Sequence, residues 1–182
     1  MDGCFAGARV FSDIHCMKTL IVVRHAKSSW NEPGLDDRER PLNERGKKDA
    51  PRMAKRLKEK DIAIELFVSS PAKRARQTAR CFVDEFDVRK KEIVLEEKLY
   101  GAAPESFYDV IAALPDKCDT VALFAHNPGI TDFVNTLTNV HVDNMPTCAV
   151  FAVHADTDKW VSFKETDKSF LFFDYPKNPL PT

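Results

Sequence analysis

Short apolar runs alternate with longer amphipathic stretches along most of the chain. The runs 20–23, 66–70 and 120–125 are rich in β-branched or aromatic residues and end abruptly in polar ones. Apolar runs of this length are typical of strands that are buried on both faces of a sheet. A shorter run at 92–96 predicts a further strand.

The stretches between these runs predict helices at about 43–60, 72–86, 105–114 and 130–137. Asn43 suits the N-cap of the first helix, which then carries Met53 and Leu57 on one apolar face. Pro71 suits the first turn of the second helix. Because strands that alternate with helices usually form a parallel sheet covered on both sides, the pattern favours an α/β fold.

The last third of the chain has a different pattern. Runs 147–154 and 159–164 predict the two strands of a hairpin, joined at 155–158, and 169–175 predicts a final strand. We therefore expect a three-layer α/β/α sandwich whose mainly parallel central sheet gains antiparallel strands late in the chain. Neither a repeat nor a linker interrupts the sequence, so residues 17–182 are predicted to form a single domain.

The composition is that of a soluble globular protein. Charged residues make up 30% of the chain, hydrophobic residues make up 43%, and the formal net charge is −1. This charge argues against a general nucleic-acid binder, so any anion site must come from local clusters of Arg and Lys. No apolar run approaches the roughly 18 residues that a membrane span needs. Five cysteines without a CxxC pair suit a reducing cytoplasm, and Cys81, Cys118 and Cys148 are expected as small core residues.

Residues 1–16 differ from the rest of the chain. Asp2 stands where a signal peptide would be basic, and no sustained apolar run follows it. Met17 directly precedes the first strand and would make a natural start. We interpret residues 1–16 as a flexible or mis-assigned leader.

Three of the predicted strands end in residues suited to phosphate chemistry. Arg24-His25 ends the first, Ser69-Ser70 leads from the second to Arg74, and His126-Asn127 follows 120–125. The carboxyl ends of parallel strands share one edge, so these groups are expected to converge. Arg offers a charged donor fork that suits phosphate, and neutral His offers a nucleophilic nitrogen. One such His alone would usually be structural, but three strand ends together indicate phosphoryl chemistry.

The motifs that carry these residues resemble the histidine phosphatase superfamily, which has the phosphoglycerate mutase-like fold. The similar segments are Arg24-His25-Ala26, the stretch 69–78, His126-Asn127-Pro128-Gly129 and the stretch 38–46. Within the superfamily the chain is similar to SixA-type phosphohistidine phosphatases, over about 17–175. Ala26 departs from the usual Gly, and its methyl group is tolerable where the backbone φ is not positive.

The resemblance implies a role for each site residue. His25 would be the nucleophile that takes the phosphoryl group, and Arg24 and Arg74 would bind the phosphoryl oxygens. His126 would donate a further hydrogen bond in the transition state. Asn31 and Asn127 are expected to contact substrate. Neither a metal nor another cofactor is expected, since the cations of the protein replace magnesium and no ligand spacing resembles a zinc site.

Glu97 is the expected general acid, because 95–102 is similar to the segment of phosphoglycerate mutases that carries the proton-donating Glu. The alternative is that Glu96 and Glu97 only solvate a strand end. A departing alkoxide, whose conjugate acid has a pKa of ~15.7, needs a proton far more than an imidazole with a pKa of about 6.5. A phosphohistidine phosphatase could therefore work without Glu97, whereas a serine phosphatase or a mutase could not easily do so.

The leading functional interpretation is a monomeric cytoplasmic phosphatase that acts on phosphohistidine in a partner protein. The stretch 101–119 is short, which favours an open site. A phosphatase of small phosphorylated metabolites is the enzymatic alternative, and a non-catalytic phosphate-binding module is the alternative of another class. Trp30 is interpreted as an anchor of the loop 27–40 rather than as a substrate platform. The acidic 35–37 and basic 47–48 stretches are either docking surfaces or solvated faces.

Overall fold

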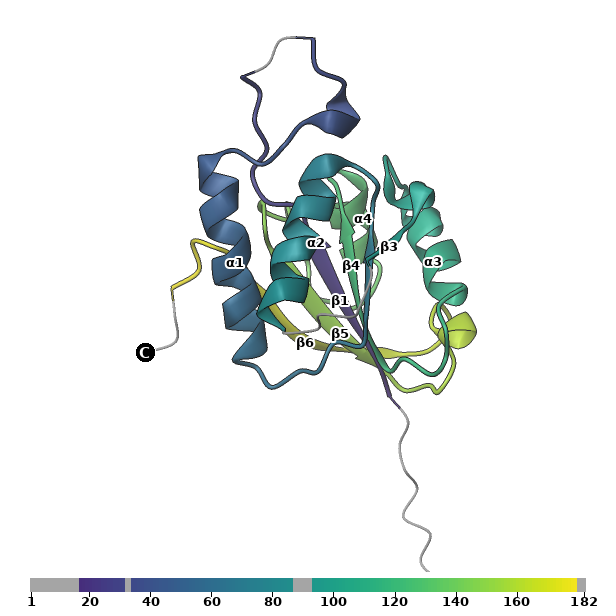
Figure 1. The fold of residues 1–182 in the computed structure, drawn as a ribbon. Helices are drawn as coiled ribbons and strands as arrows, with labels where there is room; N and C mark the ends of the chain where they lie inside the picture. Colours follow the sequence, from purple (N-terminus) through teal and green to yellow (C-terminus); the bar gives the residue numbers. More distant parts are fainter. Residues whose placement is uncertain (1–16, 32–33, 87–92, 180–182) are drawn as a thin grey trace, which may run out of the picture.

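A six-stranded sheet forms the centre of the protein (Figure 1). The computed structural model describes residues 17–31, 34–86 and 93–179. The strand order is β3-β2-β4-β1-β5-β6, in which β3, β2, β4 and β1 run parallel and β5 and β6 are antiparallel additions. The strands are β1 (Lys18–Arg24), β2 (Leu66–Ser69), β3 (Val94–Leu95), β4 (Thr120–Ala125), β5 (Val150–Ala155) and β6 (Lys168–Asp174).

Helices cover both faces of this sheet. The pair α1 (Glu44–Lys58) and α2 (Lys73–Glu85) packs on one face, and α3 (Pro104–Ala112) and α4 (Gly129–Val134) pack on the other (Figure 1). Short 3-10 turns lie at η1 (Asp37–Glu39), η2 (Glu97–Leu99) and η3 (Trp160–Ser162). The predicted three-layer α/β/α sandwich with a mainly parallel sheet is therefore confirmed.

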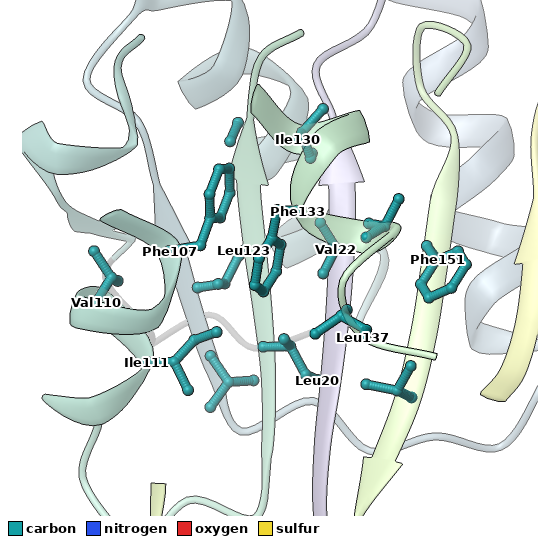
Figure 2. Close-up of a cluster of buried hydrophobic side chains, with 14 of the residues drawn as sticks. Leu20, Val22, Phe107, Val110, Ile111, Leu123, Ile130, Phe133, Leu137 and Phe151 are labelled. Atoms are coloured by element: carbon teal, nitrogen blue, oxygen red, sulfur yellow. The ribbon is translucent and has the colours of Figure 1, made fainter. Parts of the chain in front are cut away.

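Strand β1 shows why the sheet lies at the centre of the core. Leu20 and Val22 point to the α3/α4 side, where they join Phe133 and Leu123 (Figure 2). The intervening Ile21 and Val23 join the cluster on the α1/α2 side. Each such side chain contributes about 1.5–3 kcal/mol by leaving water, so a strand that is apolar on both faces is held between the two helical layers.

The N-terminal end of α1 matches its sequence signals. The side chain of Asn43 accepts a hydrogen bond from the Gly46 amide at 2.9 Å, as an N-cap does. Met53 and Leu57 are buried on the inner face of the helix. The expectation for Pro71 is wrong, because α2 begins at Lys73 with Ala72 as its extended N-cap, so Pro71 precedes the helix.

The predicted strand at 159–164 is also wrong, since η3 is a helical turn and β5 pairs with β6. Trp160 and Phe163 are both fully buried in one cluster. Residues three apart point the same way in a helical turn but to opposite faces of a strand, so one-sided burial favours the turn. The Trp160 amide and indole N–H groups are bonded to Asp116 and Cys118.

Other differences concern the ends of elements. β3 is limited to two residues, β5 starts later than expected, and α4 ends at Val134. Cys148 is buried, while Cys81 and Cys118 are half-buried against the core. Residues 1–16 lie outside the described residues. Within the described part of the chain, every helix is too short or too polar to cross a bilayer.

Candidate active site

A cavity of about 240 Å³ lies where β1, β2 and β4 end. It brings together the strand-end residues that the sequence singled out, and α2 adds its first turn. The lining residues are Arg24, His25, Lys27, Ser28, Trp30, Arg40, Arg74, His126, Asn127 and Thr147. Four of them carry permanent positive charge, so a protein with a net charge of −1 has concentrated cations at one point.

His25 follows β1, and the protein holds its ring in one tautomer. Nδ1 lies 2.7 Å from the carbonyl oxygen of Ala26. A carbonyl only accepts hydrogen bonds, so we assign the proton to Nδ1, which leaves Nε2 with a free lone pair. Burial lowers the pKa of His25 well below its usual value, and the nearby His126, Arg74 and Arg24 lower it further. The imidazole is therefore neutral and nucleophilic at pH 7.

Ala26 fits the backbone without strain. Among non-glycine residues in the described ranges, positive φ occurs only at Asp61 and Cys148, so the methyl group of Ala26 meets no conformational penalty. Its amide donates to Thr78 Oγ1 at 3.0 Å, which ties the end of β1 to α2.

His126 follows β4, and its ring centre lies 4.9 Å from that of His25. Its Nε2 is 2.7 Å from Ser70 Oγ. The Ser70 hydroxyl accepts from the Ala72 amide, and Nε2 is the acceptor that its own proton can reach, so we assign that proton to the bond with Nε2, which places the ring proton on Nδ1. Nδ1 is buried and has no partner in the protein. Burial, followed by Arg74, lowers the pKa of His126 to about 3, so this Nδ1–H belongs to a neutral ring and is a buried donor without a protein acceptor.

The two arginines of the cavity are anchored through their outer groups. Arg24 Nη1 donates to the carbonyl of Met145 at 2.5 Å, while its buried Nε has no partner. Arg74 Nη2 donates to Asp37 Oδ2 at 2.8 Å, and its Nη1 donates to the backbone carbonyl of the same residue. Guanidinium N–H groups remain on both residues for an anion in the cavity.

Sequence reasoning missed Arg40, which lines the cavity, and Asp37, which bonds to both Arg40 and Arg74. The Asp37 carboxylate accepts from Arg74 at 2.8 Å, from Arg40 at 2.7 Å and from the Tyr100 hydroxyl at 2.8 Å. Burial by itself raises the pKa of Asp37, but the hydrogen bonds from Arg74, Tyr100 and Arg40 outweigh it and lower this pKa to about 2. Asp37 therefore connects η1 to α2 as a carboxylate, a role that the prediction of a docking or solvated surface at 35–37 does not include.

The remaining predicted site residues lie in different places. Asn127 lines the cavity, and its side chain is bonded to Asn144, Met145 and Thr131. Asn31 is exposed and does not line the cavity. Glu97 also lies outside the lining; its carboxylate is 67% exposed and pairs with Arg38 at 2.8 Å. Among the described residues, no group of three or more His, Cys, Asp or Glu could hold a metal ion.

An α/β/α sandwich that gathers two histidines and two anchored arginines at the ends of parallel strands is the arrangement of an enzyme that handles phosphoryl groups. Residues 20–116 match the family described as "Histidine phosphatase superfamily (branch 1)", and the chain belongs to this superfamily. It is a phosphatase, and thus a hydrolase, with the fold of SixA-type members.

Comparisons with individual proteins agree with this class. One solved structure is described as a candidate phosphohistidine phosphatase SixA from Agrobacterium tumefaciens. Its sequence is 26% identical to this chain, the TM-score is 0.72, and the match covers 87% of this chain and 98% of that one. A protein histidine phosphatase SixA complexed with tungstate shares the fold, with 21% identity, a TM-score of 0.73 and coverage of 87% and 97%.

The matches to relatives found by sequence cover a smaller share of each relative than the matches to solved structures do. A chloroplastic protein of Arabidopsis thaliana is 27% identical over 79% of this chain and 69% of its own. A phosphoglycerate mutase of Candida albicans is 38% identical over 47% of this chain and 37% of its own, so this chain spans little more than a third of that mutase.

Proposed function

We propose that the protein hydrolyses phosphohistidine in a partner protein, through a phosphohistidine intermediate on its own His25. The observation that carries the choice of substrate is the lining of the cavity, whose described residues include Arg, Lys and His but neither Asp nor Glu. Such a lining binds a phosphoryl group strongly, whereas Glu97, the predicted acid for a departing alkoxide, lies outside it. The lining suits a leaving group that departs easily.

In the proposed first step, His25 Nε2 attacks phosphorus in line with the leaving group. Arg24 and Arg74 bind the equatorial oxygens, and the Nδ1–H of His126 donates to one of them, where negative charge is held in the transition state. The substrate P–N bond breaks, and its electron pair goes to the departing imidazole, which is protonated by solvent. This step is favoured by positioning, because the groups that act on the phosphoryl are already anchored.

In the second step, water attacks the phosphorus of phospho-His25. The new P–N bond breaks, its electrons return to Nε2, and inorganic phosphate leaves with the remaining water proton on solvent or phosphate. The Ala26 carbonyl keeps Nδ1 protonated in both steps, so the same ring nitrogen acts as nucleophile and leaving group. Asn127 adds a polar wall, and a contact of Asn31 with substrate stays a prediction.

A protein-borne phosphate is favoured over a small metabolite by the segments around the cavity. Between η2 and β4 the chain forms the single helix α3, so no long inserted segment closes over the site from that side. The cavity of about 240 Å³ is large enough for a phosphoryl group and a ring, while a protein surface would lie outside it. The proposal therefore names a phosphotransfer or signalling domain as partner, and no cofactor is needed for the steps above.

Substrate comparison tests this proposal. We expect phosphate release from a phosphohistidine-bearing phosphotransfer domain to exceed release from p-nitrophenyl phosphate and from common sugar phosphates by about 100-fold or more in kcat/KM, because imidazole departs without an acid. The measurement is steady-state phosphate release with equal enzyme. Preference for a sugar phosphate would replace the proposal with a metabolic phosphatase that has the same nucleophile.

Glu97→Gln separates the two kinds of leaving group. We expect it to slow the hydrolysis of alkyl and aryl phosphates by about tenfold or more, and to change phosphohistidine hydrolysis by less than about twofold, because only the oxygen leaving groups need a donated proton. Glu105→Gln is the matched control, because it removes a carboxylate of α3 that pairs with Lys164. Equal losses on both classes of substrate would show that Glu97 does not act on the leaving group.

A further inference from the structure

Trp30 is a large aromatic residue that the fold leaves in water. Its side chain belongs to the loop after β1 and is 74% exposed, more than any other exposed large hydrophobic residue of the described chain. The two tryptophans differ in this respect, since Trp160 is fully buried in the core. An anchor would bury its ring, so the expectation that Trp30 anchors its loop does not fit this position.

The ring is nevertheless held in place. The guanidinium of Arg40 lies over one face, 3.1 Å from the ring centroid. Arg40 is itself buried, and its three nitrogens donate to the Ser29 carbonyl, to Asp37 and to Ser28 Oγ. Because these bonds fix Arg40, the indole rests on a rigid support. An exposed but supported ring loses little side-chain entropy when a ligand binds to it.

Trp30 stands beside the reacting groups. It lines the cavity of His25, Arg74 and His126 together with Arg40. The same two residues also line a neighbouring cavity of about 210 Å³. The indole therefore lies where the phosphate cavity meets its neighbour, within reach of a group that extends from the phosphoryl into the adjoining space.

We propose that Trp30 determines substrate specificity by stacking against a flat ring that is attached to the phosphoryl group. The proposal rests on the proposed function and deepens it, because the ring of a protein-borne phosphohistidine is such a group. Aromatic rings attract one another in offset or edge-to-face geometry, and a protonated imidazole is attracted to the indole face as a cation. An alkyl leaving group gains neither attraction.

Two pairs of small substrates isolate the ring. N-phosphoimidazole and phosphoramidate share the P–N bond and differ in the ring, and phenyl phosphate and methyl phosphate differ likewise at a P–O bond. We expect Trp30→Ala to raise KM for the two ring substrates by about three- to tenfold. KM for phosphoramidate and methyl phosphate, and the inhibition constant of inorganic phosphate, stay within twofold. Trp30→Phe keeps most of the ring preference, and Val161→Ala, which truncates another exposed apolar residue, changes none of these values.

The outcomes separate the possible failures. An equal rise in KM for ring and ring-free substrates, or weaker phosphate inhibition, would show that Trp30 shapes the loop and would overturn the proposal. Hydrolysis of the phosphate esters with no activity on either P–N substrate would refute the proposed function, while the phenyl and methyl pair would still decide on Trp30. Direct binding gives a second readout, since phenyl phosphate should quench the emission of exposed Trp30 in the His25→Ala protein more than inorganic phosphate does.

Discussion

His25→Ala is expected to lower kcat by at least about 10⁴-fold, on every substrate, while inorganic phosphate still binds. The substitution removes the lone pair that attacks phosphorus, and no other side chain among the described lining residues can replace it. The ring of His126 is 4.9 Å away, but its Nε2 is engaged with Ser70 and its Nδ1 carries the proton in our assignment. Arg24 and Arg74 are unchanged, so the anion site survives.

The measurement combines steady-state rates with quenching in alkaline denaturant, which preserves a phosphohistidine. Wild type should show an acid-labile, base-stable phosphoryl label on the protein, and His25→Ala should show none. His154→Ala is the matched control, because His154 lies on β5, where its Nδ1 is hydrogen-bonded to Thr19 Oγ1, and it does not line the cavity. Equal labelling of His25→Ala and wild type would contradict the assignment of His25.

The pH dependence tests the same residue. Burial and the neighbouring cations hold the pKa of His25 below 6.5, so wild-type kcat/KM should persist as the pH falls through 6.5.

The layers of the fold could be predicted because burial on two faces leaves a clear pattern. Residues 20–23 of β1 and 121–125 of β4 alternate between the two helical layers, so these parts of both strands appear in the sequence as continuous apolar runs. The bounds of β4 were predicted without error. The stretch 159–164 failed because its apolar residues serve a single cluster from a helical turn, and alternation along such a short run cannot distinguish the two states.

The site could be predicted only as far as strand ends determine it. Parallel strands bring their carboxyl ends to one edge, which is why Arg24, His25 and His126 meet in one cavity. The contacts of Asp37 and the exposure of Trp30 depend on how the loop after β1 returns over that edge. No periodic pattern specifies such a loop, and the acidic residues near Asp37 have the same chemistry as Asp37 itself.

The same loop joins substrate recognition to the phosphate site. The guanidinium of Arg40 packs against the Trp30 ring and donates a hydrogen bond to Asp37. The carboxylate of Asp37 also accepts a hydrogen bond from Arg74. Asp37 lines the neighbouring cavity and not the phosphate cavity, so its carboxylate lies behind Arg74 from the point of view of a bound phosphoryl group. We therefore infer that Asp37 is a positioning residue that acts through Arg74.

Arg74→Ala is expected to lower kcat/KM by about 10²–10³-fold, because it removes a preorganised cation from the charge that the transition state holds. Asp37→Asn should cost about tenfold, mainly in KM, since a neutral amide holds the guanidinium less firmly. Adding Asp37→Asn to Arg74→Ala should cost almost nothing more, because the residue that Asp37 positions is already absent.

This double-mutant cycle distinguishes positioning from a direct role. Glu39→Gln is the matched control, since it removes a neighbouring exposed carboxylate of η1 and should leave kcat/KM within twofold. Thermal melting of each variant shows whether η1 and α2 remain folded. If the losses multiply instead, Asp37 acts on the substrate independently of Arg74; a gain in affinity on Asp37→Asn would show that its carboxylate competes with phosphate for the guanidinium. Because the pKa of Asp37 is about 2, none of these effects should vary with pH between 5 and 8 through titration of that carboxyl.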